Sequence, residues 1–115
     1  PPITARDPFV VTVVGNDTVT LSDVVTGEVW LGSGQSNMEW PLERARDAEA
    51  EIARASHPQL RLFHVLHGPR VPESPRDVVG RWEVCSPATV PSFSAVAYFF
   101  GRELLTTLGR PVGLI

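Results

Sequence analysis

Ser36 is the residue whose surroundings are best suited to chemistry. It lies in the run Gly34-Gln-Ser-Asn-Met38, between β-prone residues 28–31 and a helical pattern that begins near Leu42. A serine held between a strand and a helix projects its hydroxyl clear of the sheet. Its backbone N–H, near a helix N-terminus, can face a developing oxyanion. This position suits a nucleophilic serine, but on this pattern alone a helix cap is the favoured interpretation.

The residues beside this serine are expected to shape a turn. Met38 stands where the G-x-S-x-G elbow of α/β-hydrolases has its second glycine, so the run does not indicate that elbow. Ser33 is expected to be a turn or capping hydroxyl. The residues that we expect to form the turn and its oxyanion site are Gly34, Gln35, Ser36 and Asn37.

Two β-prone runs precede the block. Residues 9–14 and 18–21 flank Gly15-Asn16-Asp17, which predicts a β-hairpin. An antiparallel hairpin does not belong inside a βαβ unit, whose strands are parallel. We therefore expect the hairpin to be separate from the elements that follow, with residues 22–26 as the crossing point.

The rest of the chain alternates strands and helices. Residues 28–31 are expected to form a short buried strand, and the segment from Trp82 to Cys85 is ambiguous. The order β-α-β-α-β predicts an α/β fold, with a parallel sheet and helical crossovers. The expected elements are a helix over 42–55, a strand over 60–66, a surface loop over 67–80, a helix over 94–108 and a strand over 112–115. In the first helix, Glu51 is expected on a solvated face. The second helix is expected to be largely buried, with Ser92 or Ser94 as its N-terminal cap and Gly109 at its C-terminal end.

Composition limits the classes of function. The chain has 115 residues, 43% of them hydrophobic, and a net charge of −3, which gives no electrostatic case for nucleic acid or an anionic membrane as partner. No apolar run approaches the roughly 20 residues that span a bilayer. A single cysteine, Cys85, excludes an internal disulfide, and we expect it to be a buried apolar side chain rather than a catalytic thiol. No cluster has metal-ligand spacing, so we expect no metal.

The remaining candidate site residues are histidines, which could act as a base, and tryptophans, which could stack on a sugar. His57 precedes a proline at a predicted helix end, which suits capping, whereas His64 and His67 flank a strand end that could lie near Ser36. Trp40 is the best candidate for stacking on a sugar; the alternative interpretation is that it packs on the first predicted helix. Trp30 is expected in the core.

The block over residues 27–40 resembles the first conserved block of the sialate O-acetylesterase-like carbohydrate esterases, which belong to the SGNH hydrolase superfamily. The runs 93–104 and 111–115 also resemble that family, in the same order and spacing. The resemblance covers roughly residues 8–115. One departure is Gly32, where many relatives have cysteine; that side chain is not part of the catalytic triad.

The resemblance implies an acetylesterase mechanism without a cofactor. Ser36 would be the nucleophile, and its own N–H one oxyanion donor. A second N–H would come from the loop that ends at Ser94. The third donor and the Asp-x-x-His pair would lie beyond Ile115. The implied substrates are acetylated carbohydrates, sialic acid or other sugars, and the implied location is secreted or periplasmic.

Domain organisation follows from the same resemblance. Residues 1–26 would end a preceding β-domain, and residues 27–115 would be the first part of an SGNH-like esterase domain. Because the sequence opens with Pro1 and closes on an apolar strand, we expect a fragment, inactive alone, that needs the remainder of the esterase in the same or a second polypeptide. The alternatives are a non-catalytic carbohydrate-binding or structural segment, and an esterase acting on a non-sugar substrate.

Overall fold

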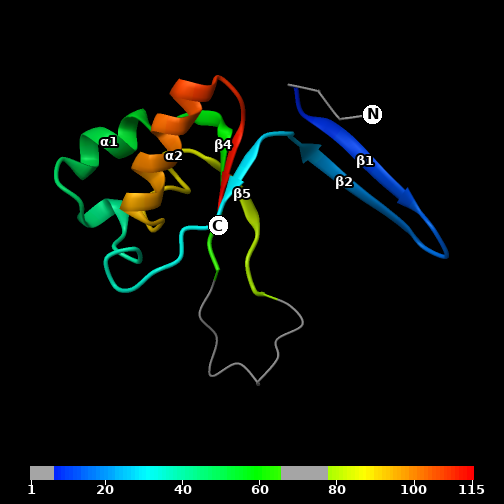
Figure 1. Ribbon diagram of the computed structural model, residues 1–115, viewed down its shortest axis with the longest axis horizontal. Helices are drawn as coiled ribbons and strands as arrows, with labels where there is room; N and C mark the ends of the chain where they lie inside the picture. Colours follow the sequence, from blue (N-terminus) through cyan, green and yellow to red (C-terminus); the bar gives the residue numbers. More distant parts are fainter. Residues whose placement is uncertain (1–6, 66–77) are drawn as a thin grey trace.

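A computed structural model describes residues 7–65 and 78–115 of the chain (Figure 1). The loop predicted over 67–80 lies mostly outside these residues. Within the described part, no helix is long and apolar enough to cross a membrane. The elements are β1 (Phe9–Val14), β2 (Thr18–Val24), β3 (Glu28–Trp30), the 3-10 helix η1 (Leu42–Arg44), α1 (Ala48–Arg54), β4 (His57–Phe63), β5 (Trp82–Cys85), α2 (Ala95–Leu108) and β6 (Val112–Leu114).

The predicted hairpin is confirmed as a two-stranded antiparallel sheet of β1 and β2. Its turn is closed by the N–H of Gly15, which donates to the carbonyl of Asp17 at 2.9 Å. The register shifts near Asp23, whose φ of 57° is left-handed. The carboxylate of Asp23 pairs with the guanidinium of Arg61 on β4, and this ion pair ties the hairpin to the main sheet.

The main sheet has four strands in the order β3-β6-β4-β5. The strands β3, β6 and β4 are parallel, which confirms the predicted α/β architecture for these three. The ambiguous segment Trp82–Cys85 forms β5, antiparallel to β4, so the sheet is mixed. No helix connects β4 to β5 within the described residues, and strands joined without a crossover helix pair antiparallel.

Both helices cover one side of this sheet, and the hairpin lies on the other (Figure 1). Buried side chains of β4 and β6 pack beneath α2, whose Tyr98 is fully buried. Gly101 allows this close packing, because a Cβ there would lie 2.5 Å from Cδ1 of Leu114. The predicted caps are confirmed: Ser94 Oγ accepts a hydrogen bond from the N–H of Ala97, and Gly109 is left-handed at the C-terminal end.

The predicted helix over 42–55 is wrong in its first half. The chain forms one 3-10 turn, then bends through a left-handed Asp47 before α1 begins. The N–H of Leu42 donates to the carbonyl of Phe93, and that of Glu43 to Pro91, each at 2.9 Å. These tertiary hydrogen bonds draw the first turn toward the loop before α2. The strand after α1 begins earlier than predicted, so His57 lies in β4 and not at a helix cap.

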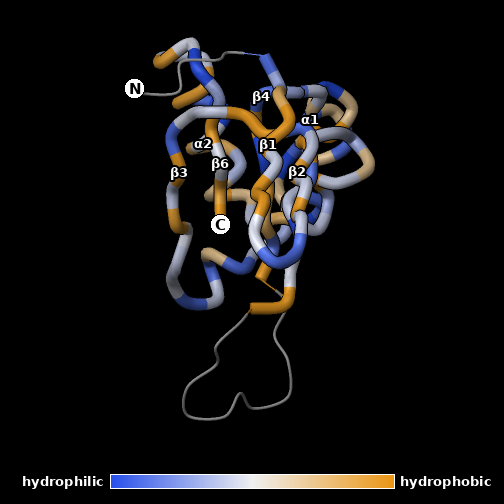
Figure 2. Tube along the Cα trace, turned by 90° about the vertical axis from the view of Figure 1, so that its right-hand side faces the viewer, coloured by the Kyte–Doolittle hydropathy of each residue, from blue (hydrophilic) through white to orange (hydrophobic). Residues whose placement is uncertain are grey.

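Burial also differs from the prediction at β3 and α2. Trp30, expected in the core, is 45% exposed, and Val29 beside it is 63% exposed. On α2, predicted to be largely buried, Val96 and Phe100 are nearly half exposed. Trp30 and Val29 are exposed because β3 is an edge strand of the sheet. Figure 2 shows the hydrophobic residues of β3 at the margin of the molecule, next to β6.

Candidate active site

A cleft of about 340 Å³ opens where three parallel strands end. The turn with Ser36 follows β3, His64 follows β4, and Ile115 follows β6; all three residues line the cleft. The loop over 92–94, which precedes α2, also lines it. The carboxyl ends of parallel strands are the usual place for a site in an open α/β sheet. The fold thus brings the predicted nucleophile block and the predicted oxyanion loop into one cleft.

The turn around Ser36 is built by short-range contacts. The N–H of Gly32 donates to the carbonyl of Ile115 at 2.6 Å, which prolongs the pairing of β3 with β6. The N–H of Met38 donates to the carbonyl of Gln35 at 2.8 Å and closes a turn with Ser36 inside it. Gly34 is required there, since a Cβ would lie 2.4 Å from Cγ of Met38. The Ser36 side chain is exposed at the cleft.

Several backbone N–H groups at this cleft have no hydrogen-bond partner among the described residues, and those of Ser36 and Ser94 are two of them. The loop that carries Ser94 is fixed on both sides, because the carbonyl of Phe93 accepts from Leu42 and the N–H of Ala95 donates to Trp40 at 2.8 Å. Fixed N–H groups without a partner can receive developing negative charge.

Only one of the three histidines is seen at the cleft. The His64 ring meets the Phe93 ring edge to face, with centroids 6.1 Å apart, and makes no hydrogen bond to Ser36 in the described structure. His57 begins β4, so it lies at the opposite end of that strand from His64, 6.3 Å from the ring of Tyr98. His67 lies outside the described residues.

The other singled-out side chains lie away from the chemistry. Trp40 is half exposed, does not line the cleft, and donates its indole N–H to the carbonyl of Arg44 at 3.1 Å. Cys85 is buried, as predicted, and burial raises the pKa of its thiol to about 12. Within residues 7–65 and 78–115, no group of histidine, cysteine and carboxylate side chains could hold a metal ion.

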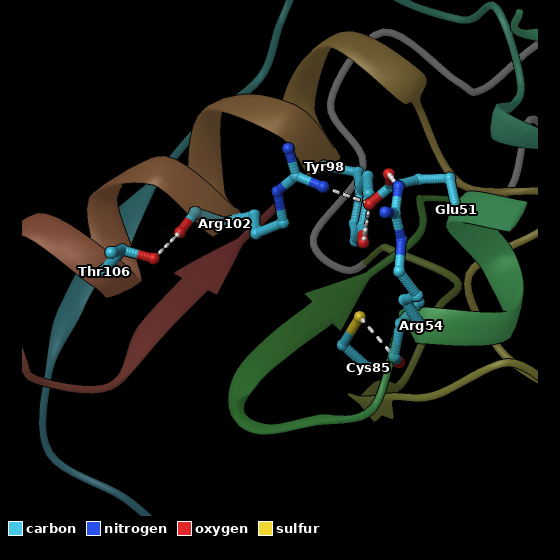
Figure 3. Close-up of polar contacts among 7 residues, drawn as sticks. Glu51, Arg54, Cys85, Tyr98, Arg102 and Thr106 are labelled. Carbon is cyan, nitrogen blue, oxygen red and sulfur yellow. Dashed lines mark hydrogen bonds and ion pairs between the residues drawn. The ribbon is translucent and has the colours of Figure 1, made fainter. Parts of the chain in front are cut away.

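A buried polar cluster between α1 and α2 was missed by sequence reasoning (Figure 3). Glu51, predicted on a solvated face, is only 6% exposed and accepts a hydrogen bond from the Tyr98 hydroxyl at 2.8 Å. It also pairs with Arg54 at 2.7 Å and with Arg102. Burial opposes its ionisation, but the hydrogen bonds from Tyr98, Arg54 and Arg102 outweigh burial and lower the pKa of Glu51.

This cluster, named here the Glu51 cluster, consists of Glu51, Arg54, Tyr98 and Arg102. It joins α1 to α2, and α2 carries the Ser94 loop at its N-terminus. Burial and the neighbouring Glu51 raise the pKa of Tyr98 to about 12, so its hydroxyl stays a donor at neutral pH. The available signal in the sequence was the three-residue spacing of Glu51 and Arg54, which puts both on one helix face.

No family model matches the chain, but it is similar to known proteins. It is 32% identical over 108 residues to the sialate O-acetylesterase of Mus musculus and 34% identical over 108 residues to that of Homo sapiens, alignments that cover 87% of this chain and 20% and 21% of those proteins.

A solved structure is also similar. A carbohydrate acetylesterase from Xanthomonas citri superposes with a TM-score of 0.89 at 40% identity, over 99% of this chain and 27% of that one. These findings confirm the resemblance that residues 27–40 predicted. The chain is related to the sialate O-acetylesterase-like carbohydrate esterases, and it spans about a fifth of the length of the curated relatives that it matches.

Proposed function

We propose that this chain is the nucleophile-bearing part of a serine esterase that removes O-acetyl groups from carbohydrates, built on the SGNH plan. The observation that carries the proposal is the shared cleft: an exposed serine in a hydrogen-bonded turn and the loop before α2 line it together, and the N–H groups of Ser36 and Ser94 have no partner among the described residues. The similarity to carbohydrate acetylesterases supports the substrate class.

The proposed reaction begins with attack of Ser36 Oγ on the acetyl carbonyl carbon while a base takes the hydroxyl proton. The carbonyl oxygen becomes an oxyanion, which the N–H groups of Ser36 and Ser94 stabilise. The ester bond then breaks, the sugar oxygen takes the proton from the base, and an acetyl-serine remains. Water, activated by the same base, attacks the acetyl-serine and releases acetate.

The base is proposed to come from polypeptide beyond Ile115, as the family's Asp-x-x-His pair. His64 is the alternative, because it lines the same cleft. In the absence of the triad partners, turnover falls to what the oxyanion site alone contributes. We therefore expect these 115 residues alone to be inactive or nearly so. Strong turnover by this chain alone, lost on Ser36→Ala, would instead assign the base to His64 or His67.

The domain assignment and the location are part of the same proposal. Residues 1–26 would end a preceding β-domain, and the formation of a separate two-stranded sheet by β1 and β2 is in line with this assignment. Residues 27–115 would open the esterase domain. A secreted or periplasmic location is proposed on the family resemblance alone.

The test is hydrolysis of an acetylated sugar and of p-nitrophenyl acetate by the protein at its natural length. Ser36→Ala is expected to lower kcat/KM by at least about 1000-fold, since the nucleophile and its base act as one unit. Ser56→Ala is the matched control, because Ser56 is exposed between α1 and β4 and does not line the cleft. Equal activity of both variants would exclude Ser36 as the nucleophile and favour a non-catalytic segment.

A further inference from the structure

A short backbone bridge joins residues 40–42, which follow the Ser36 turn, to residues 93–95 of the loop before α2. Its centre is an isolated antiparallel pair of Pro41 with Ser94. The hydrogen bonds that flank this pair run in opposite directions, from the N–H of Ala95 to the carbonyl of Trp40 at 2.8 Å and from the N–H of Leu42 to the carbonyl of Phe93 at 2.9 Å. The bridge therefore holds side by side two segments that are about fifty positions apart in the sequence.

The side chain of Trp40 closes the segment that supplies one side of the bridge. Its indole N–H donates to the carbonyl of Arg44 at 3.1 Å, which ties residue 40 to the end of the 3-10 turn η1. Within that turn, the N–H of Leu42 takes part in the bridge, and the N–H of Glu43 donates to the carbonyl of Pro91 at 2.9 Å. Because the indole fixes the turn relative to residue 40, it also fixes the direction of these two donors.

Both proposed oxyanion donors are attached to this bridge. Ser94 lies within it, and Ser36 precedes Trp40 by four residues, in the turn that Met38 closes. Ser36 and Ser94 both line the cleft. Oxyanion donors stabilise developing charge only at the correct distance, and a misplacement of about 1 Å can lower a rate by about 100-fold. The bridge is thus placed to set the separation of the two N–H groups.

The position of Trp40 separates this role from stacking on a sugar. The neighbouring Glu39 lines the cleft, but Trp40 does not, although 49% of Trp40 is exposed. Its indole N–H is already engaged by Arg44. Trp40 is therefore connected to the cleft through the backbone that it holds.

We infer that Trp40 is a positioning residue for the reaction at Ser36. Its indole N–H holds residues 40–44 in place, and the backbone bridge passes this constraint to the N–H of Ser94. The inference rests on the proposed function, because it concerns the donors to an oxyanion formed on an acetyl ester. It assigns no contact between Trp40 and the substrate.

Steady-state kinetics with two substrates test the inference on the protein at its natural length. Trp40→Phe keeps an aromatic ring but removes the indole N–H. We expect kcat to fall by about 10-fold with KM unchanged, for an acetylated sugar and for p-nitrophenyl acetate alike, since p-nitrophenyl acetate has no sugar to stack on. A rise in KM for the acetylated sugar alone would overturn the inference in favour of stacking. Wild-type kinetics with both substrates would also overturn it.

Trp82→Phe is the matched control for the loss of an indole. Trp82 lies on β5, is 48% exposed and does not line the cleft, so we expect wild-type kcat and KM. An equal fall of kcat in this variant would overturn a special role for Trp40. If the wild-type protein hydrolyses neither substrate, the proposed function fails and the inference fails with it. If the wild type is active and Trp40→Phe matches it, the inference alone fails.

Hydrogen exchange at single amides gives a readout that does not depend on activity. In Trp40→Phe, the amides of Leu42 and Ala95 should exchange at least about 10-fold faster than in the wild type, because the bridge opens more often. The amide of Ile115, which donates to Trp30 at 2.9 Å in the main sheet, should keep its rate. Unchanged rates at Leu42 and Ala95 would overturn the inference. Equal acceleration at Ile115 would show a loosening of the whole fold and would overturn it as well.

Discussion

The Glu51 cluster and the Ser36 turn differ in how their polar groups are used. In the cluster, a carboxylate that is 6% exposed receives hydrogen bonds from Tyr98, Arg54 and Arg102, so its polar capacity is taken up within the fold. At the turn, the Ser36 hydroxyl makes no hydrogen bond among the described residues, and its N–H is also unused.

This difference distinguishes the Glu51 cluster, whose polar groups stabilise the fold, from the Ser36 turn, whose polar groups are available for a reaction. A buried charge must be satisfied internally, or its desolvation destabilises the folded state. A nucleophile and an oxyanion donor must instead keep their capacity for the substrate. We therefore expect changes in the Glu51 cluster to act on stability and changes at Ser36 to act on activity.

The largest stability effect is expected for Glu51→Ala. The substitution leaves the Tyr98 hydroxyl and the Arg102 guanidinium without their shared acceptor, and we expect a loss of about 3 kcal/mol in the free energy of unfolding. Urea unfolding measures it. Glu49→Ala is the control, because Glu49 is exposed on the same helix and should change stability by less than about 0.5 kcal/mol. Similar losses for both variants would contradict a special role for the cluster.

A smaller effect is expected for Gly34→Ala, which tests the turn. The new Cβ would lie 2.4 Å from Cγ of Met38, so Met38 or the turn must move, at a cost of about 1–3 kcal/mol. Because the turn carries Ser36, esterase activity should fall more than stability. Gly15→Ala is matched to it, since a Cβ at the hairpin tip would meet its nearest atom at 3.7 Å. An active, stable Gly34→Ala protein would show that the turn is adaptable.

The smallest effect concerns pH. The pKa of Glu51 in the folded state lies below the ordinary value of 4.5, so its stabilising contribution is complete above that value and is lost as pH falls through the folded pKa. We expect wild-type stability to fall more steeply than that of Glu51→Gln as the pH drops below about 4.5. Urea unfolding from pH 7 to pH 3 checks this. Parallel profiles would mean that another carboxylate governs the acid transition.

Local sequence patterns predicted the elements that depend on local interactions. The β1–β2 hairpin formed around its turn signal, and α2 runs between the predicted caps at Ser94 and Gly109. The cleft was also anticipated in part, since Ser36 and Ser94 were both named and line it together. Their chemical roles stay predictions.

The features that were missed depend on contacts between distant segments. The helix predicted from Leu42 is interrupted because its first N–H groups bond to Phe93 and Pro91, about fifty positions away along the chain. Trp30 was predicted in the core from its residue type, but it lies in the edge strand β3 and is nearly half exposed. Glu51 was predicted to be solvated from its place in the helix pattern, but Tyr98 and Arg102 of the other helix pack beside it and bind its carboxylate.

The assignment of Ser36 as the nucleophile is tested most directly by covalent labelling. The protein at its natural length would be treated with a fluorophosphonate, which forms a stable bond only with an activated serine, and the modified peptide identified by mass spectrometry. We predict one adduct, on Ser36, formed as fast as esterase activity is lost, and none in the Ser36→Ala protein. Inactivation with the adduct on another serine, or activity unaffected by the reagent, would contradict the assignment.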